Sequence, residues 1–167
     1  KRIFLTEGVA KGLLTTASVA TFGGFLQLKA GPKVERITIT LPTLPQAFDG
    51  FTIAQLSDIH IGPILNKDFA QKIVMQTMEL KADLIALTGD LVDGSIDQLR
   101  DHVMPFQQFK AEHGVYMVTG NHEYYSGADE WLAHFETFGI QGLRNSNKII
   151  EKKIKEVTLG MWLQMGL

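Results

Sequence analysis

The sequence predicts an α/β fold built on a parallel sheet. Three short apolar runs, 51–56, 83–87 and 115–118, have the character of strands, and each is followed by a polar loop and then by a helical pattern. The later two runs are almost continuously apolar, which is typical of parallel strands buried on both faces. In such folds the functional loops lie beyond the carboxyl ends of the strands. We therefore expect one α/β domain whose site is formed by the three loops.

The amino-acid composition excludes several classes of protein. The chain has 167 residues, of which 45% are hydrophobic and 20% are charged, so it can bury one compact core and is not a disordered segment. It contains no cysteine, which excludes a disulfide framework, a thiolate zinc site and a cysteine nucleophile. The net charge of −2 provides no global basic field, so nucleic acid is not an expected partner.

Residues 1–32 form a separate N-terminal segment. Lys1 and Arg2 precede a run rich in Gly, Ala and Thr, and no charged residue lies between Lys11 and Lys29. Basic residues ahead of such a run are typical of an export signal, and the opening Lys-Arg-x-Phe-Leu resembles a twin-arginine motif with Lys in place of the first Arg. We expect an apolar N-terminal helix that is signal-like or membrane-proximal. The alternative is an ordinary soluble helix.

The expected elements of the domain begin just after this segment. Residues 34–41 largely alternate apolar and polar side chains, which predicts a half-buried strand that ends at Pro42. After the second strand, at 51–56, Asn66 is a suitable N-cap for a helix over 67–80. The apolar stripe of this helix consists of Phe69, Ile73, Val74 and Met78.

Two more helices are expected around the third buried strand. The first covers 95–109, and Pro105 should interrupt or kink it because proline has no N–H to donate. The second covers 127–138 and ends at Gly139. The last segment, 151–167, begins like a strand and then loses any regular pattern, so we expect an atypical tail there.

Metal-binding side chains follow directly after all three predicted buried strands. The three loops hold, in order, Asp58 with His60, Asp90 with Asp93, and Asn121 with His122. Asp58 and His60 are two residues apart, so on an extended chain both project to one side and could hold one ion. Gly89 permits a sharp backbone turn that would leave the Asp90 carboxylate free to bridge two ions.

The donor types indicate which cofactor to expect. Carboxylate, amide and imidazole groups together suit Mn, Fe or Zn better than Ca. Two such cations about 3.5–4 Å apart would polarise a phosphoryl oxygen and lower the pKa of a bridging water. We therefore expect two divalent metal ions at the three loops, with His122 beside them.

The motifs, taken together, resemble one protein family. They are, in chain order, Asp58-x-His60, Gly89-Asp90-x-x-Asp93 and Gly120-Asn121-His122-Glu123. This set resembles the calcineurin-like metallophosphoesterase superfamily, and the flanking residues are similar to its bacterial membrane-associated or twin-arginine-exported branch. The resemblance implies a domain over 33–150 that contains the N-terminal half of an αββα sandwich, preceded by the apolar helix.

The resemblance also implies the metal ligands. Asp58 and His60 would bind the first metal. Asp90 would bridge both metals, and Asn121 would bind the second.

The remaining motif residues would act around the metals. His122 would be the catalytic residue, which either steadies the charge on the transferred phosphoryl group or protonates the leaving group. Asp93 would orient His122 or a ligand, and Glu123 would hold the loop.

One departure from the family pattern affects the functional prediction. The family completes its metal site with a further histidine and a Gly-His-x-His loop downstream, whereas the last histidine here is His134. We therefore expect a C-terminally truncated form. The predicted function is a metallophosphoesterase that hydrolyses phosphomonoester, phosphodiester or pyrophosphate bonds by a two-metal mechanism. The alternative is a catalytically inactive truncated relic or interaction module with a partial metal site.

Partners and location follow from the same features. The expected partner is a phosphate-ester substrate, and a lipid-linked phosphate is a candidate if the N-terminal segment lies at a membrane. The expected location is the bacterial cell membrane or cell envelope. A metal-dependent nuclease would share the motifs, but the net charge argues against it. The sequence leaves the oligomeric state open.

Overall fold

The computed structural model describes residues 9, 11–19, 21, 23–24, 31–154 and 157–164. The chain divides into two units, residues 1–34 and residues 35–167. In the first unit, positions 11–19 are helical, while much of the expected N-terminal helix lies outside the described residues and stays a prediction. Within the described part of the chain, no helix has both the length and the apolar character needed to cross a membrane.

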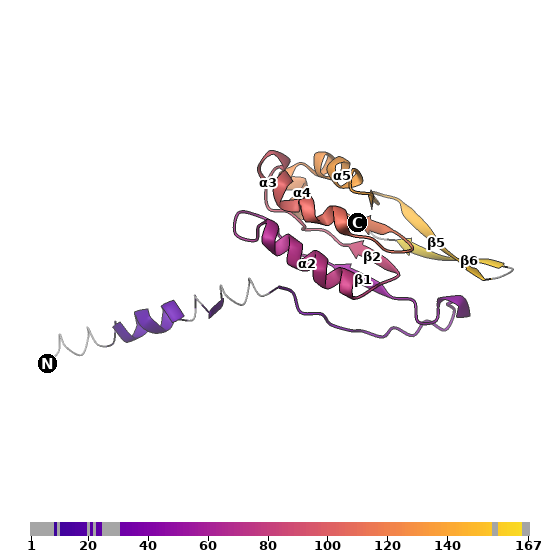
Figure 1. Cartoon of the computed structure of the whole chain (residues 1–167), viewed down its shortest axis with the longest axis horizontal. Coiled ribbons are helices and arrows are strands. Elements are labelled where there is room, and N and C mark those ends of the chain that lie inside the picture. Colours follow the sequence, from indigo (N-terminus) through magenta and orange to yellow (C-terminus); the bar gives the residue numbers. More distant parts are fainter. Residues whose placement is uncertain are drawn as a thin grey trace. The chain divides into compact units, whose positions relative to one another are not determined.

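A four-stranded parallel sheet is the centre of the second unit (Figure 1). Its strands are β1 (Ile53–Leu56), β2 (Leu84–Leu87), β3 (Val115–Met117) and β4 (Ile140–Gly142), which lie side by side in that order. The first three confirm the strands predicted after residue 50. β4 was not predicted, because only one of its three residues, Ile140, has an apolar side chain. The loops after β1, β2 and β3 therefore leave the same edge of the sheet.

The helix α2 (Lys67–Glu79) connects β1 to β2 and begins where the sequence predicts. The Asn66 side chain accepts a hydrogen bond of 3.1 Å from the backbone N–H of Asp68, which confirms Asn66 as the N-cap. Ile73 and Val74 are buried against the sheet, and Phe69 and Met78 pack partly buried beside them.

The helix predicted over 95–109 is two helices. α3 (Ile96–Val103) is followed without a gap by the 3-10 helix η2 (Met104–Gln108), and Pro105 lies at the start of η2. This confirms the interruption expected from proline. The helix predicted over 127–138 is α5 (Ala128–Glu136), preceded by Gly127 in the left-handed conformation at φ 97°.

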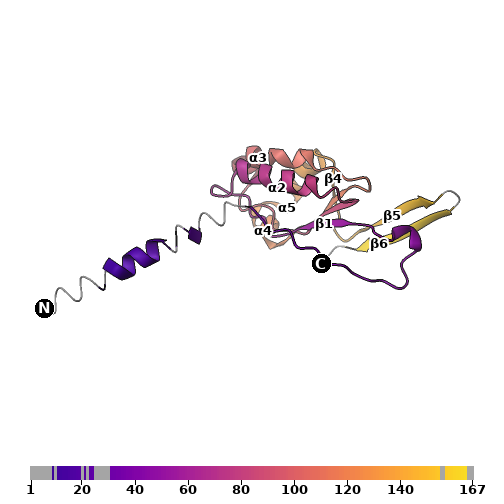
Figure 2. The ribbon, with the colours of Figure 1, turned by 60° about the horizontal axis from the view of Figure 1, so that its bottom comes forward.

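The two faces of the sheet bury different sets of side chains. On one face Ile85 and Leu87 pack beneath α2, α3 and α5, where Trp131 and Phe135 of α5 are fully buried. Figure 2 shows α2 and α3 on the same side of the sheet. The alternate residues Leu84 and Ala86 point to the other face, as the period of two in a strand requires.

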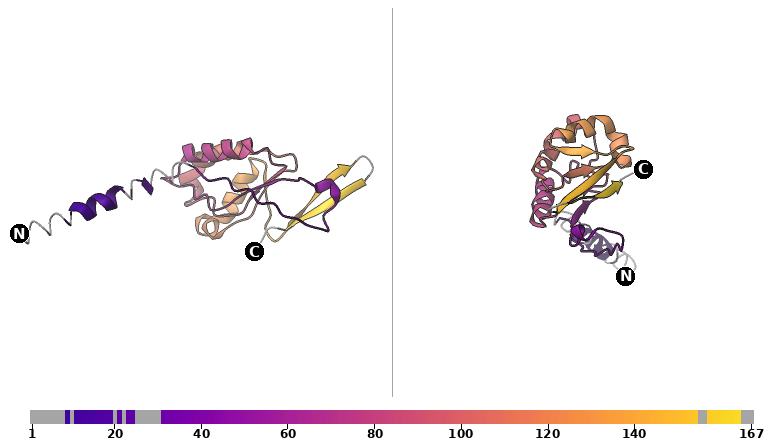
Figure 3. Two further views of the ribbon diagram at one scale, coloured as in Figure 1. Left: turned by 90° about the horizontal axis from the view of Figure 1, so that it is seen from below. Right: turned by 90° about the vertical axis from the view of Figure 1, so that its right-hand side faces the viewer.

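That second face is covered by a hairpin and a short 3-10 helix. The hairpin consists of β5 (Asn147–Ile154) and β6 (Val157–Gln164), paired antiparallel, and the 3-10 helix is η1 (Gln46–Phe48). Phe48 and Ile150 are buried against Leu84 and Tyr116 of the sheet. Figure 3 shows η1 beside β5. The unit thus has a layer of helices on one face of the parallel sheet, while Phe48 of η1 and Ile150 of β5 pack against the other face. The second sheet and the second helix layer of the expected αββα sandwich stay a prediction.

Two predictions for local structure were wrong. Residues 31–40 have no regular secondary structure, so the strand expected over 34–41 is absent, and Ile37 and Ile39 are 80% and 74% exposed. The alternation of apolar and polar residues describes this segment alone, whereas a strand also needs a neighbouring strand for its backbone hydrogen bonds. The loop expected at 121–123 is instead the first turn of α4 (Asn121–Ser126). The hairpin also gives regular pairing to much of the segment that we expected to be an atypical tail.

Candidate metal centre

The loops after β1 and β2 are joined by backbone hydrogen bonds. The N–H of His60 donates to the carbonyl of Asp90 at 3.0 Å, and the N–H of Ile61 donates to the carbonyl of Leu91 at 2.8 Å. The N–H of Asp93 returns to the carbonyl of Ile61 at 2.9 Å. The parallel pairing of the two strands therefore continues into the loops, and it sets His60 beside Asp90.

Three of the predicted site residues have an uncommon backbone conformation. Asp58, His60 and Asp90 have φ values of 55°, 52° and 53°, in the left-handed region that non-glycine residues seldom occupy. Such residues persist only where surrounding interactions hold them, and they cluster at ligand-binding sites. The backbone bonds between the two loops provide that support.

Two glycines allow the loops after β2 and β3 to approach closely. A Cβ atom on Gly120 would lie 2.2 Å from Oδ1 of Asp90, and a Cβ atom on Gly89 would lie 2.5 Å from the backbone nitrogen of Gly120. No side chain fits at these distances. The glycines of the Gly-Asp and Gly-Asn motifs are therefore needed for contact between the loops as well as for a turn.

Glu123 in α4 joins the same two loops through its carboxylate, which is fully buried. Oε2 accepts from the N–H of Asp90 at 2.9 Å and from the N–H of Gly120 at 2.7 Å. Oε1 accepts from the N–H of Leu91 at 2.7 Å and from the N–H of Val92 at 3.3 Å. A buried charge is expensive unless such bonds compensate it, so this arrangement fixes the loop around Asp90 to the start of α4.

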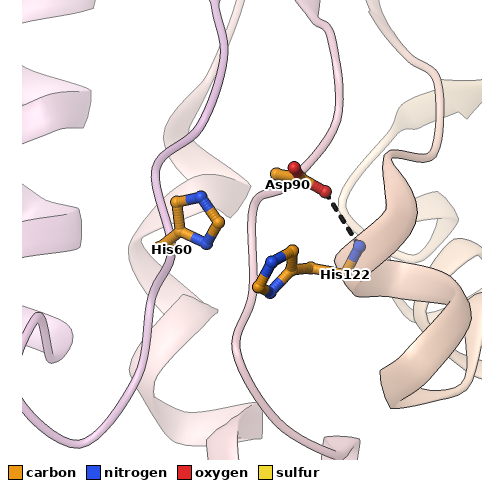
Figure 4. Close-up of side chains that lie close together, drawn as sticks. All are labelled: His60, Asp90 and His122. Carbon is orange, nitrogen blue, oxygen red and sulfur yellow. Dashed lines mark hydrogen bonds between the residues drawn. The ribbon is translucent and has the colours of Figure 1, made fainter.

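The three loops bring His60, Asp90 and His122 together (Figure 4). Each of these side chains offers one donor atom to a group in which all atoms lie within 4.8 Å of one another. Oδ1 of Asp90 also accepts a hydrogen bond of 2.9 Å from the backbone N–H of His122. This bond holds the carboxylate in place while its second oxygen remains available for a cation.

Asp93 lies behind the two histidines. Its Oδ1 is 2.7 Å from Nδ1 of His60 and 2.7 Å from Nδ1 of His122, and the two rings are nearly perpendicular with centroids 4.5 Å apart. The hydrogen bond to Asp93 raises the pKa of His60 above its ordinary value, while burial opposes the increase. Because both Nδ1 atoms face Asp93, Nε2 is the nitrogen that each ring has left for a metal or a substrate.

The other two predicted ligands lie at the edge of this group. The Asp58 side chain is 68% exposed, and its Oδ1 is 3.9 Å from Nε2 of His60. The hydroxyl of Ser57 donates to the Asp58 carboxylate, a contact that sequence reasoning missed. Asn121 is exposed and is the first residue of α4, adjacent to His122.

Two further residues make contacts next to the site that the sequence did not predict. The indole Nε1 of Trp131 donates to the carbonyl of Gly94 at 3.0 Å, next to Asp93. Nδ1 of His102 is 3.3 Å from the carbonyl of Gly62 in the loop after β1. The sequence has no signal for either contact, because both depend on the path of the loops and not on a local pattern.

The donor set fits a divalent transition metal. Imidazole nitrogens combined with carboxylate oxygens suit Mn, Fe or Zn, and the closeness of His60, Asp90 and His122 meets the geometric requirement for one ion. Asp93 contacts the imidazoles of His60 and His122, as residues that orient metal ligands do, and Glu123 holds the backbone of the loop that carries Asp90.

Comparison with known protein families agrees with this geometry. The family model described as calcineurin-like phosphoesterase matches residues 51–159, which include β1 to β4 and all the predicted site residues. The chain belongs to the calcineurin-like phosphoesterase family. The expected metallophosphoesterase superfamily is thereby confirmed, and the observed parallel sheet with loops at its carboxyl edge is consistent with a domain of this family.

Individual relatives of this calcineurin-like phosphoesterase come from animals and bacteria. A Danio rerio protein named as a transmembrane protein with a metallophosphoesterase domain is 36% identical over 84% of this chain and 34% of its own length. Metallophosphoesterases named as uncharacterized in Helicobacter pylori and Bacillus subtilis are 35% and 30% identical, over 73% and 70% of this chain. They are matched over 32% and 41% of their own lengths, so the chain spans well under half of each relative. No solved structure matches the chain.

Proposed function

We propose that the protein is a two-metal phosphoesterase that hydrolyses a phosphomonoester, phosphodiester or pyrophosphate bond. The observation that carries the proposal is the convergence of His60 and Asp90, from two loops, with His122 of α4 within 4.8 Å. Membership of the calcineurin-like phosphoesterase family supports the same reaction class.

Contacts of Asp58, His60 and Asp90 support their proposed roles as ligands. Asp58 and His60 would bind one ion, since Oδ1 of Asp58 and Nε2 of His60 are 3.9 Å apart. Asp90 would bridge to a second ion, because one of its oxygens is held by the N–H of His122 and the other is available. Asn121 would add a neutral oxygen to the second ion. When bound, divalent ions of this kind polarise a phosphoryl oxygen and lower the pKa of a coordinated water.

His122 is the proposed catalytic residue. Its Nδ1 is 2.7 Å from the Asp93 carboxylate, which fixes the ring and leaves Nε2 to face a phosphate ester. From there His122 would stabilise the negative charge that develops on the phosphoryl group or donate a proton to the leaving oxygen. Asp93 would act through His122, and Glu123 would hold the loops that carry both Asp90 and His122.

Hydrolysis of chromogenic esters tests the proposal. The full chain should hydrolyse p-nitrophenyl phosphate or bis(p-nitrophenyl) phosphate with Mn²⁺, Fe²⁺ or Zn²⁺, and Asp90→Asn and His122→Asn should each lower kcat by roughly 100-fold or more. Asp97→Asn on the exposed surface of α3 is the matched control and should retain wild-type activity. Absence of turnover with all three metals would contradict the proposal, as would full activity in Asp90→Asn.

We further propose a location at the bacterial cell membrane or envelope and a substrate that includes a lipid-linked phosphate. Two features support this: the uncharged run between Lys11 and Lys29, and the name of the Danio rerio relative, a transmembrane protein. Co-sedimentation of the full chain with anionic phospholipid vesicles tests the location. A chain that lacks residues 1–32 should stay in the supernatant, and equal sedimentation of both forms would contradict the proposed role of this segment.

A further inference from the structure

A second aromatic side chain lies beside the proposed catalytic histidine. Tyr125 follows His122 by three residues in α4, and residues three apart lie on the same face of a helix. The two rings have centroids 6.0 Å apart at an angle of 66°, an edge-to-face arrangement. Tyr125 is therefore directed to the same side of α4 as the metal centre.

Folding does not account for this position of Tyr125. Its side chain is 81% exposed, so the ring buries little surface against the rest of the protein. Tyr124, by contrast, packs its ring against the Arg144 guanidinium, 5.6 Å from ring centroid to Cζ, and Arg144 is itself paired with Asp129. The adjacent tyrosine thus has a local structural contact, whereas the contact of Tyr125 is with His122.

We propose that Tyr125 is a specificity-determining residue that packs against the organic group of the phosphate ester, and that the site prefers esters with an aromatic group. The inference rests on the proposed phosphoesterase function. A phosphate ester bound at a metal ion held by His60 and Asp90, with its leaving oxygen near His122, would present its esterified group on the side of α4 that carries the exposed Tyr125 ring. Aromatic rings pair favourably in stacked or edge-to-face arrangements.

Two phosphonates measure this preference without turnover. Phenylphosphonate and methylphosphonate share the anionic group but differ in the aromatic ring, and neither contains a hydrolysable ester. Titration calorimetry of the full chain with Mn²⁺ should give a dissociation constant roughly tenfold lower for phenylphosphonate. Tyr125→Ala should bring the ratio of the two constants close to one, and Tyr125→Phe should retain the wild-type ratio. Tyr124→Ala, the matched control, should also retain it.

The same variants distinguish substrate contact from support of His122. If Tyr125 contacts the substrate, Tyr125→Ala raises the KM for p-nitrophenyl phosphate roughly tenfold and changes kcat by less than about twofold. The inference is overturned if the wild-type chain binds both phosphonates equally. It is also overturned if Tyr125→Ala leaves the ratio of the two dissociation constants unchanged, whether the variant keeps its affinity or loses affinity for both ligands equally. If the chain hydrolyses no ester but still binds phenylphosphonate more tightly than methylphosphonate, the result counts against the proposed hydrolysis and supports the aromatic subsite.

Discussion

The buried carboxylate of Glu123 lies 2.9 Å from the backbone nitrogen of Asp90, a residue 33 positions earlier in the chain. The same carboxylate also accepts from the N–H of Gly120 at 2.7 Å, so one side chain joins the loops after β2 and β3. Because Asp90 lies on the first of these loops and His122 lies in α4 directly after the second, the metal centre depends on Glu123, which is not itself a proposed metal ligand.

Replacement of Glu123 should weaken the whole centre. Glu123→Gln puts an amide donor where backbone N–H groups now donate, so at least one buried N–H loses its acceptor. We expect the free energy of unfolding to fall by about 2–4 kcal/mol, together with a loss of Mn²⁺ affinity. Urea unfolding and titration calorimetry measure the two effects. Glu112→Gln, on the exposed surface, should change neither, and wild-type stability of Glu123→Gln would contradict this account of the loops.

The contact between the second and third loops should not tolerate a side chain. In Gly120→Ala the new Cβ would meet Oδ1 of Asp90 at 2.2 Å and the backbone nitrogen of Asp90 at 2.6 Å, so the loops must separate. We expect a loss of about 1–3 kcal/mol in the free energy of unfolding and at least tenfold weaker Mn²⁺ binding. Gly12→Ala serves as the control, because nothing lies within 4 Å of its Cβ. Unchanged Mn²⁺ affinity in Gly120→Ala would show that the close approach is unnecessary.

Trp131 should influence the metal centre through the loop that carries Asp93. Trp131→Phe keeps an aromatic ring in the core but removes the indole donor to the Gly94 carbonyl. We expect the free energy of unfolding to fall by about 1–2 kcal/mol and the Mn²⁺ affinity to fall with it. Phe135→Leu is the matched control, since it disturbs the same core but leaves that hydrogen bond. It should reduce stability and spare Mn²⁺ affinity. Equal Mn²⁺ affinity in the two variants would show that the Trp131 hydrogen bond does not support the metal centre.

His134 should make stability depend on pH. Burial, together with the nearby Arg100 guanidinium, lowers the pKa of His134 below its ordinary value. Its Nε2 has no hydrogen-bond partner within the described residues, and its ring packs against Phe138 with centroids 4.7 Å apart. The unfolded chain therefore takes up this proton at a higher pH than the folded chain. The stabilisation from neutral His134 is complete above the ordinary histidine pKa and is lost as the pH falls through that value toward the folded pKa.

Unfolding in urea at about pH 8 and about pH 5 measures this effect. The free energy of unfolding of the wild type should fall more steeply between these values than that of His134→Leu, which has no proton to take up at this position. The other histidines are common to both proteins and cancel in the difference. Parallel pH profiles would contradict the predicted shift.

The sheet and its loops were predictable because they depend on local patterns. The apolar runs ending at Leu56, Leu87 and Val118 have the length and composition of buried strands, and parallel pairing then requires the following loops to meet. Asn66 and Pro105 act on their own helices, so their effects were also predictable. The strand β4 was missed because Gln141 and Gly142 follow its one apolar residue, Ile140, so it lacks the apolar run that indicated β3.

The remaining features depend on contacts between distant parts of the chain. The expected strand over 34–41 failed because its alternation says nothing about whether a partner strand lies beside it. The left-handed φ of His60 is held by backbone bonds to the loop of Asp90, which no pattern near His60 reveals. The bonds of Glu123 similarly join residues more than 30 positions apart, so the sequence indicated a supporting role but not the partners.

Anomalous diffraction at the manganese K edge, from crystals of the full chain grown with Mn²⁺, tests the central claim that three loops form a metal centre. The account predicts an anomalous peak within coordination distance of a His60 nitrogen and an Asp90 oxygen, and weaker or absent density in Asp90→Asn. A well-ordered site with no peak beside either residue, or a peak that persists unchanged in Asp90→Asn, would contradict it.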